Sequence, residues 1–150
     1  MSRFRGRYDY SIDEKGRINI PSKFRKLLSQ ESQETFVVCR APDGCLRAYP
    51  KDEWEKVEDT FAAMPTNREM NNYQRQVQNT LSDPVLDKQG RIALTPLQVK
   101  IAGLSKDVSI IGRGRYLEIW DTKRFEEYTG SGEDFDEVYY KIVQAGVRLG

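Results

Sequence analysis

Hydrophobic and polar positions alternate in the first part of the chain, as they do in half-buried β-strands. Tyr8-Asp-Tyr10 and Ile18-Asn-Ile20 each place two large side chains on one face and a polar one on the other. Further on, Pro42-Asp-Gly44 indicates a turn between the strands expected at Phe36–Arg40 and Leu46–Tyr49. The pattern therefore predicts short strands that are joined by tight turns.

Three later segments show the apolar spacing of amphipathic helices, with one apolar residue every three or four positions. The first begins at Pro50, the second connects the two parts of the chain, and the third lies near its end. Their apolar positions are Trp54, Val57 and Phe61, then Met70, Tyr73, Val77 and Leu81, and finally Phe135, Val138, Tyr139 and Ile142. We expect these stripes to form core or subunit contacts rather than to bind a cofactor.

The chain contains an internal repeat. Asp13-Glu-Lys-Gly-Arg-Ile-Asn-Ile20 matches Asp87-Lys-Gln-Gly-Arg-Ile-Ala-Leu94 at an offset of 74 residues, and a proline-marked helix start follows each copy. In the second copy, Thr95 is expected to cap that helix and Pro96 suits its first position. Downstream landmarks correspond at an offset of 71 residues, namely Leu46 with Leu117, Tyr49 with Trp120, and Trp54 with Phe125. We interpret the chain as a tandem duplication.

The duplication predicts a mainly β fold with short helices, of the α+β class. Each unit is expected to run strand, tight turn, strand, short helix, strand, turn, strand, helix. We expect residues 1–57 to form the first half, 58–81 a helical connector, 82–128 the second half and 129–150 a C-terminal helical tail.

Composition and length exclude several classes of protein. With 150 residues, of which 38% are hydrophobic and 31% charged, the chain is typical of a soluble globular protein. No apolar run approaches the roughly 20 residues needed to cross a bilayer, and no apolar core follows the basic N-terminus as in a secretory signal. We therefore expect a cytoplasmic protein without membrane contact.

The chain has no histidine and two cysteines, Cys39 and Cys45, which are too few ligands for a zinc site. We expect both cysteines to be small apolar core residues, while a disulfide stays open as the less usual alternative in the cytosol. No metal and no cofactor is expected. Without histidine, Ser–His and Cys–His nucleophiles are unavailable, and no phosphate-binding glycine loop is present, so we expect no enzyme activity.

Charge is distributed unevenly although the formal net charge is only +1. Residues 1–30 carry eight basic and three acidic side chains, whereas residues 126–140 carry six acidic and no basic ones. A basic front and an acidic tail suggest one face that is made for an anion.

The repeated Asp-x-x-Gly-Arg turn is the strongest candidate for that face. The aspartate can cap its own turn and the glycine tolerates positive φ, but a turn in itself has no need of the arginine. Both copies nevertheless keep it, and a lysine lies nearby in each. Such arginines could contact guanine bidentately, while lysines and the basic N-terminus would contact phosphates. The expected DNA-binding residues are Asp13, Lys15, Gly16 and Arg17, then Asp87, Lys88, Gly90 and Arg91, and finally Arg3, Arg5 and Arg7.

The two copies differ after the turn. The first continues with Pro21-Ser-Lys-Phe-Arg25, and the second with Thr95-Pro-Leu-Gln-Val99, which lacks counterparts of Lys23 and Arg25. We therefore expect the second half to contribute less to DNA binding. Because so few contacts would give one chain only weak, salt-sensitive binding, we also expect several copies to act together on repeated short sites.

The landmarks of the chain closely resemble those of the MraZ family, within the SpoVT/AbrB-like group of swapped-hairpin transcription factors. The resemblance runs in register from Ser2 to Tyr128, and segment Gly130–Gly150 lies outside it with an open role. It is carried by the turn motifs within Ser11–Ile18 and Leu86–Ile92, and by Phe4-Arg-Gly6, Asp43-Gly-Cys-Leu46, Tyr49-Pro50, Glu53-Trp54 and Glu118-Ile-Trp-Asp121.

The resemblance implies that two AbrB-like halves form a pseudo-dimeric swapped-hairpin β-barrel within one chain. It also implies a homo-oligomeric ring and a nucleoid-associated repressor. This repressor binds short direct repeats in double-stranded DNA, in the promoter of its own gene and of the division and cell-wall cluster. The family signature falls on Asp13 with Arg17 and on Asp87 with Arg91.

Two other functions stay open. The protein could be a ring-forming scaffold or protein-interaction module whose turns only stabilise hairpins. It could also be an AbrB-like antitoxin, although such proteins usually have a single half and a disordered toxin-binding tail. Salt-dependent binding to a repeated DNA site would separate a regulator from a scaffold, and co-purification with a toxin would indicate an antitoxin.

Overall fold

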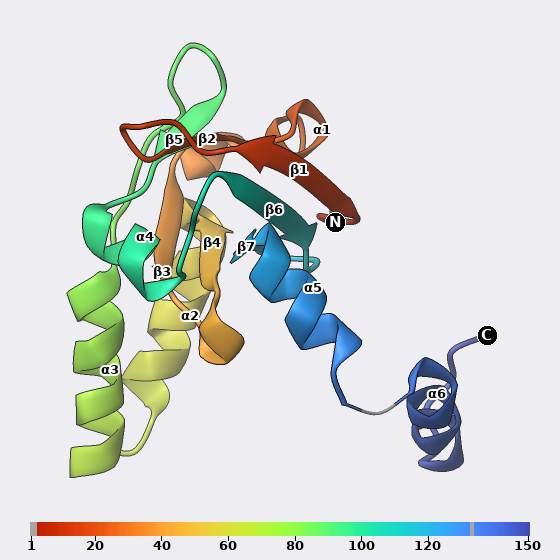
Figure 1. The fold of residues 1–150 in the computed structure, drawn as a ribbon. Helices are drawn as coiled ribbons and strands as arrows, with labels where there is room; N and C mark the ends of the chain where they lie inside the picture. Colours follow the sequence, from red (N-terminus) through yellow and green to blue (C-terminus); the bar gives the residue numbers. More distant parts are fainter. Residues whose placement is uncertain (1–2, 133) are drawn as a thin grey trace.

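The structure is a computed structural model, and it describes residues 3–132 and 134–150. Its main element is a five-stranded antiparallel sheet with the strand order β1-β6-β7-β4-β3 (Figure 1). These strands are β1 (Arg7–Ser11), β3 (Phe36–Arg40), β4 (Leu46–Pro50), β6 (Asp107–Gly112) and β7 (Leu117–Asp121). The expected mixed fold, with an antiparallel sheet and short helices, is confirmed.

A second, two-stranded sheet consists of β2 (Arg17–Asn19) and β5 (Arg91–Ala93), which contribute one strand from each half. Ile18 lies opposite Ile92, and both are buried. Because each strand directly follows one of the repeated turns, their pairing brings the two turns to the same end of the molecule (Figure 1).

Backbone hydrogen bonds interlock the two halves at these turns. The Leu94 N–H donates to the Gly16 carbonyl at 2.8 Å, and the Ile20 N–H donates to the Gly90 carbonyl at 2.9 Å. Each turn glycine is therefore tied to the strand of the opposite half. Both have positive φ, +75° at Gly16 and +76° at Gly90, which only glycine adopts without strain.

The leading segment of each half also pairs with the other half. β1 lies antiparallel to β6 over its full length. In the reciprocal arrangement, Phe36 donates its N–H to the Pro84 carbonyl at 3.0 Å and Leu86 donates its N–H to the Glu34 carbonyl at 2.9 Å. The halves are interleaved, and neither can keep its backbone hydrogen bonds without the other.

One expected strand is reduced. The repeat predicted a strand before the second turn, but residues 82–86 form only isolated bridges at Ser82 and Val85. Pro84 accounts for this difference, because it lacks the N–H that a continuous ladder requires.

The core lies between the sheets and draws on both halves. It contains fully buried aliphatic and aromatic residues, and Phe24 packs edge-to-face against Phe4 and Tyr8 with ring centroids 5.2 and 5.1 Å apart. Each such side chain contributes about 1.5–3 kcal/mol through burial. The largest buried members besides Phe24 are Ile18, Ile20, Phe36, Leu46, Ile92, Ile110, Leu117 and Ile119.

The short helices α1 (Ser22–Arg25) and α4 (Pro96–Ile101) occupy equivalent places in the two halves. As expected, Pro96 opens α4 and the Thr95 hydroxyl accepts the Gln98 N–H at 3.1 Å. Gln98 stands where the first half has Phe24, and its side chain is fully buried.

The Gln98 amide ties three segments together. Its Nε2 donates to the Thr80 carbonyl at 2.8 Å and to the Ser82 hydroxyl at 2.9 Å, and its Oε1 accepts the Thr95 N–H at 3.0 Å. Gln98 therefore fixes the end of the connecting helix against α4, which explains a buried polar side chain at a core position.

The predicted longer helices are confirmed. α2 (Lys51–Ala63) and α3 (Arg68–Thr80) lie side by side (Figure 1). Phe61 contacts both Trp54 and Tyr73, with ring centroids 6.1 Å apart in each pair.

The remaining helices follow the second half. α5 (Thr122–Gly130) packs on β6 and β7 through Phe125. α6 (Phe135–Gln144) stands apart, and none of its residues is buried. The short 3₁₀ turns are η1 (Gln30–Ser32) and η2 (Pro42–Gly44).

Both cysteines are buried free thiols, as the expected structural role requires. Burial raises the pKa of the Cys39 thiol to about 11 and that of the Cys45 thiol to about 12, so both stay protonated at neutral pH. In residues 3–132 and 134–150, no group of three potential metal ligands occurs and no helix is long and apolar enough to cross a membrane.

Replacing Gln98 with methionine tests the role of its amide. Gln98→Met keeps a side chain of similar length but removes the partner of the Thr95 N–H and of the Thr80 carbonyl. We expect the free energy of unfolding to fall by about 1–3 kcal/mol in urea denaturation. Gln76→Met, the same substitution at an exposed position of α3, is the control and should change it by less than about 0.5 kcal/mol. Equal effects of the two substitutions would contradict this role.

The two turn glycines should differ in their tolerance of alanine. A Cβ at Gly16 would lie 2.9 Å from the Leu94 carbonyl oxygen, which is fixed backbone. The three atoms nearest to a Cβ at Gly90 all belong to the Arg25 side chain, which can move. Since the positive-φ strain is shared, we expect Gly16→Ala to lower the free energy of unfolding by about 1 kcal/mol more than Gly90→Ala. Urea denaturation of both variants measures the difference, and a larger loss for Gly90→Ala would show that Arg25 is rigid.

Candidate nucleic-acid interface

The first turn is organised around one carboxylate. Oδ1 of Asp13 accepts the backbone N–H groups of Lys15 at 3.0 Å and of Arg17 at 2.8 Å. The turn is closed by the Gly16 N–H, which donates to the Asp13 carbonyl at 3.0 Å. This is the self-capped aspartate turn that the motif predicted.

The second turn repeats this geometry. Oδ1 of Asp87 accepts the N–H groups of Gln89 and Arg91, both at 2.9 Å. The Gly90 N–H donates to the Asp87 carbonyl at 3.0 Å. The equivalence that was inferred from the sequence repeat therefore extends to individual hydrogen bonds.

Each turn also uses its arginine. Nε of Arg17 donates to Oδ2 of Asp13 at 2.6 Å, and Nε of Arg91 donates to Oδ2 of Asp87 at 2.9 Å. Each arginine therefore pairs with the same aspartate that closes its turn through backbone hydrogen bonds. The expectation that the aspartates hold the arginine side chains in place is confirmed.

The two turns meet at Asp13. Nη1 of Arg91 lies 3.7 Å from Oδ2 of Asp13, so this carboxylate lies between the arginines of both turns. The Arg17 side chain is 35% exposed, and the Arg91 side chain is 22% exposed. The structure thus brings the two arginines together and leaves Arg17 the more accessible of the two.

Hydrogen bonding lowers the pKa of both aspartates from its ordinary value. The largest cause is the backbone N–H of Arg17 for Asp13 and that of Arg91 for Asp87, and the arginine side chains add to it. A carboxylate whose pKa is lower in the folded state stabilises that state above the unfolded pKa of about 3.9. This contribution is lost as the pH falls through the folded pKa, so the turns keep their ionised aspartates at neutral pH.

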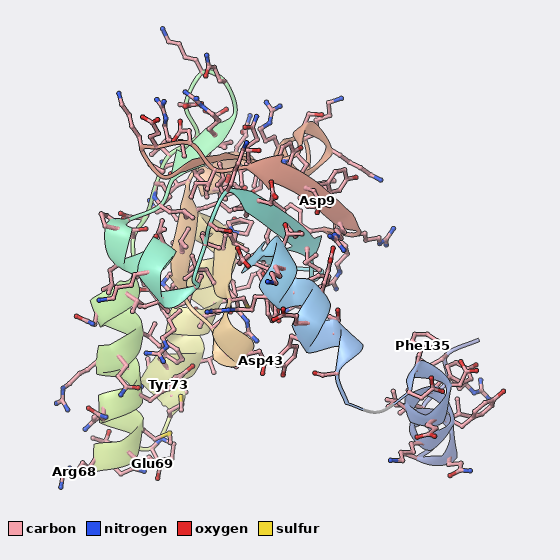
Figure 2. The ribbon with its side chains drawn as sticks, in the orientation of Figure 1. Asp9, Asp43, Arg68, Glu69, Tyr73 and Phe135 are labelled. Atoms are coloured by element: carbon pink, nitrogen blue, oxygen red, sulfur yellow. The ribbon has the colours of Figure 1, made fainter. Side chains whose placement is uncertain are left out.

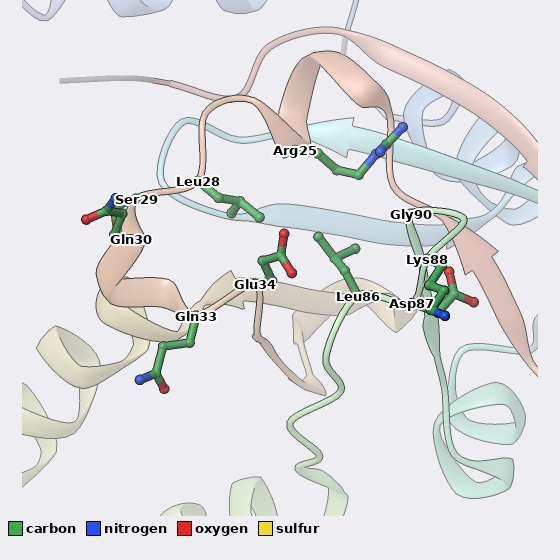
Figure 3. Close-up of a pocket in the computed structure, with 10 residues that line it drawn as sticks. All are labelled: Arg25, Leu28, Ser29, Gln30, Gln33, Glu34, Leu86, Asp87, Lys88 and Gly90. Atoms are coloured by element: carbon green, nitrogen blue, oxygen red, sulfur yellow. The ribbon is translucent and has the colours of Figure 1, made fainter.

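Further basic side chains surround the turns. A pocket of about 510 Å³ beside the second turn is lined by Arg25 and Lys88 together with Glu34 and Asp87 (Figure 3). A larger pocket of about 860 Å³ lies beside the first turn, and its basic lining residues are Lys15, Lys100 and Lys106. Each turn therefore has cations contributed by other segments.

The position of Arg25 changes one argument made from the sequence, namely that the second turn has fewer cations because the second half lacks a counterpart of Arg25. Its Nε donates to the Ile20 carbonyl at 3.1 Å, and its guanidinium covers Gly90 of the second turn. The first half therefore supplies a cation to the second turn. The equivalent residue of the second half is the apolar Val99, which lines the pocket beside the first turn together with Gly16. The lack of an Arg25 counterpart in the second half does not make its turn less basic. No local pattern signals this exchange, because it arises from pairing between the halves.

The basic N-terminal residues are not brought to the turns. Arg7 is the first residue of β1, and Arg3 and Arg5 precede it, so the length of this strand lies between them and Asp13. A strand rises about 3.3 Å per residue. Arg7 is held by Asp9 at 2.9 Å and by Glu126 at 3.0 Å. Arg5 is exposed, and Arg3 lines a separate pocket. Their expected role in phosphate binding stays a prediction.

Comparison with protein families places the chain among known proteins. Residues 3–79 and 82–138 match the family described as "MraZ protein, putative antitoxin-like". The match extends ten residues beyond Tyr128, which is farther than the resemblance visible in the sequence.

Curated relatives with the name "Transcriptional regulator MraZ" align over nearly the whole chain. The protein of Nitratidesulfovibrio vulgaris strain Hildenborough is 35% identical, and the alignment covers 96% of each chain. The proteins of Clostridium tetani and Clostridium beijerinckii are 33% and 38% identical, with 96% of this chain and 99% of theirs covered. Because the family match covers most of the chain and these identities exceed 30%, the chain belongs to the MraZ family.

Proposed function

We propose that this protein is a sequence-specific, DNA-binding transcriptional regulator that acts as a repressor. Its targets would be short direct repeats upstream of the bacterial division and cell-wall gene cluster, including its own promoter. The observation that carries the proposal is the pair of equivalent turns whose aspartates hold Arg17 and Arg91 side by side.

The chemistry of these arginines supports base reading. The aspartates engage the Nε atoms, and among the described residues the Arg17 guanidinium has no other hydrogen-bonding partner. Its terminal nitrogens can therefore donate to O6 and N7 of a guanine, a contact worth about 1–3 kcal/mol of discrimination. Because the side chain is already held in place, binding costs less conformational entropy than it would for a mobile arginine.

The surrounding cations support phosphate contacts. Lys15 and Lys88 are exposed beside the turns, and Arg25 adds a cation to the second turn. With a net charge of only +1, one chain would bind weakly, so the proposal includes a homo-oligomeric ring that occupies several repeats at once.

The interleaved strands support the proposed architecture. β1 and residues 82–86 each pair with the opposite half, which is the exchange expected of an AbrB-like swapped-hairpin barrel formed as a pseudo-dimer within one chain. The same proposal divides the chain into the halves 1–57 and 82–128, the connector 58–81 and the tail 129–150. It locates the protein in the cytoplasm at the nucleoid.

An antitoxin role is the second candidate, because the family description includes the words "putative antitoxin-like". It would require a toxin partner that covers an exposed surface of the chain. Co-purification of one defined toxin at fixed stoichiometry would support it, and a chain that purifies alone and binds DNA tightly would not.

Arg17 variants test whether the turn reads bases. We expect tight binding to a duplex from upstream of its own gene, measured by fluorescence anisotropy, and weak binding to a shuffled duplex. Arg17→Ala and Arg17→Lys should each lose about tenfold or more on the specific duplex, because lysine cannot donate bidentately to guanine. Lys123→Ala, exposed on α5, is the control for a general loss of charge.

Comparison of the variants on the specific and the shuffled duplex separates the alternatives in the same experiment. An Arg17→Lys variant that binds like the wild type would show that Arg17 contacts phosphate rather than a base. Equal, weak binding of all variants to every duplex would make the turns structural and favour a scaffold. Circular dichroism establishes that each variant is folded.

The two arginines are expected to contribute unequally. Arg17 is 35% exposed, whereas Arg91 is 22% exposed and also faces Asp13 of the other turn. We therefore expect Arg17→Ala to reduce affinity for the promoter duplex more than Arg91→Ala, by about threefold or more. Anisotropy titrations at one salt concentration measure both losses, and equal losses would contradict the prediction.

A further inference from the structure

The last helix, α6, presents an apolar face that no described residue of its own chain covers. Phe135 is 81% exposed and is the most exposed large hydrophobic residue of the described chain (Figure 2). Helical spacing places four more apolar residues on the same side. All four are at least 36% exposed, and they are Val138, Tyr139, Ile142 and Val143.

A helix of this length needs a partner surface. α6 has ten residues, none of them buried, and isolated helices shorter than about 12–15 residues are marginal in water. Its link to α5 runs through Gly130-Ser-Gly132. A Cβ added at Gly130 or at Gly132 would have no atom within 4 Å other than those of its chain neighbours or its own helix. The helix therefore stands clear of the body that could stabilise it (Figure 1).

The charge of α6 limits what can cover it. Asp134, Asp136 and Glu137 flank Phe135, and Lys141 follows a turn later. An acceptor surface must therefore combine an apolar floor for Phe135 with a basic rim.

Two pockets of the same chain combine apolar and basic lining residues. The larger, of about 860 Å³, includes Lys15 and Gly16 of the first turn, which the proposed function assigns to DNA. The other includes no residue of either turn. It has a volume of about 390 Å³ and lies between the N-terminal segment, α2 and the β6–β7 turn. Its lining includes Tyr49 and Tyr116, whose ring centroids are 5.0 Å apart. It also includes five charged residues, which we call the rim: the cations Arg3, Lys56, Arg113 and Arg115, and the carboxylate Glu53.

The rim keeps positive charge after internal pairing. Lys56 contacts Glu53 at 3.0 Å and Arg113 contacts Glu118 at 3.2 Å. Arg3 and Arg115 form no ion pair with any residue in the described part of the chain. The groove between α2 and α3 is a poorer acceptor, because its rim carries more acidic than basic groups, namely Glu55, Glu58 and Asp83 against Lys51.

We propose that α6 of one copy docks into this pocket of a second copy, with Phe135 over the tyrosines and its flanking carboxylates against the arginine rim. The contact joins two different surfaces, so it is head-to-tail and generates a ring when the rotation closes. The inference deepens the oligomeric part of the proposed function by naming the segment and the surface that join the copies.

Removing the aromatic anchor tests the contact. Sedimentation velocity of the full chain over a concentration series should show assembly, and Phe135→Ala should raise the concentration at half-assembly by about tenfold or more. Tyr140→Ala is the matched control, because Tyr140 is 61% exposed but lies about 140° around the helix from Phe135. It should change assembly by less than about twofold. Normal assembly of Phe135→Ala, or a wild-type chain that stays monomeric, would overturn the proposal.

Charge-reversal variants test whether α6 docks into this pocket and whether the pocket belongs to a second copy. Arg115→Glu and Asp136→Arg should each weaken assembly, because each creates like charges across the contact. An equimolar mixture of the two variants should assemble again, since each helix then meets a pocket of opposite charge on the other variant. If α6 docked into the pocket of its own chain, mixing would restore nothing, and that result would overturn the proposal.

DNA binding is measured separately on the same proteins. Phe135→Ala should bind a duplex with a single repeat as the wild type does, within about threefold, and should lose the tighter binding to a duplex with several repeats. A wild-type chain that assembles through α6 but binds no DNA would refute the proposed function and leave the contact standing. Assembly that is unaffected by Phe135→Ala, together with normal DNA binding, would refute only the contact.

Discussion

The pairing of β2 with β5 is the constraint on which the rest of the structure depends. It joins the two halves at Ile18 and Ile92, and both residues are buried at the centre of the shared core. Each strand emerges directly from a repeated turn, so the pairing fixes the turns beside one another. Without it, the arginines of the two turns would belong to separate hairpins, and the candidate DNA-binding surface would not exist.

Within each turn, one carboxylate serves both the fold and the proposed function. Asp13 accepts two backbone N–H groups, which closes the turn, and its second oxygen holds Arg17. The structural and functional explanations of the motif are therefore not alternatives. The aspartate that makes the turn stable is also the group that would pre-organise the arginine for a base. Its negative charge reduces the attraction for phosphate, which makes the neighbouring lysines and Arg25 necessary to the proposal.

Features that depend on local spacing could be predicted from the sequence, and features that depend on pairing between halves could not. The turns, the cap at Thr95 and the helices α2, α3 and α6 follow from residues within a few positions of one another. Arg25 could not be assigned to the second turn, because it reaches Gly90 only through the exchange of strands. Likewise, the ion pair between Arg7 and Glu126 joins residues 119 positions apart, and nothing near Arg7 indicates it.

The duplicated halves are not interchangeable, and the differences bear on the kind of DNA site that fits. A symmetric dimer presents equal reading heads in opposite orientation and matches a palindrome. Here Gln98 replaces Phe24, Val99 replaces Arg25, and the two turn arginines differ in exposure. The two halves of each chain therefore differ, which gives the chain a defined direction. Copies joined head-to-tail through α6 would all point the same way along DNA, and such an arrangement would fit the proposed series of direct repeats.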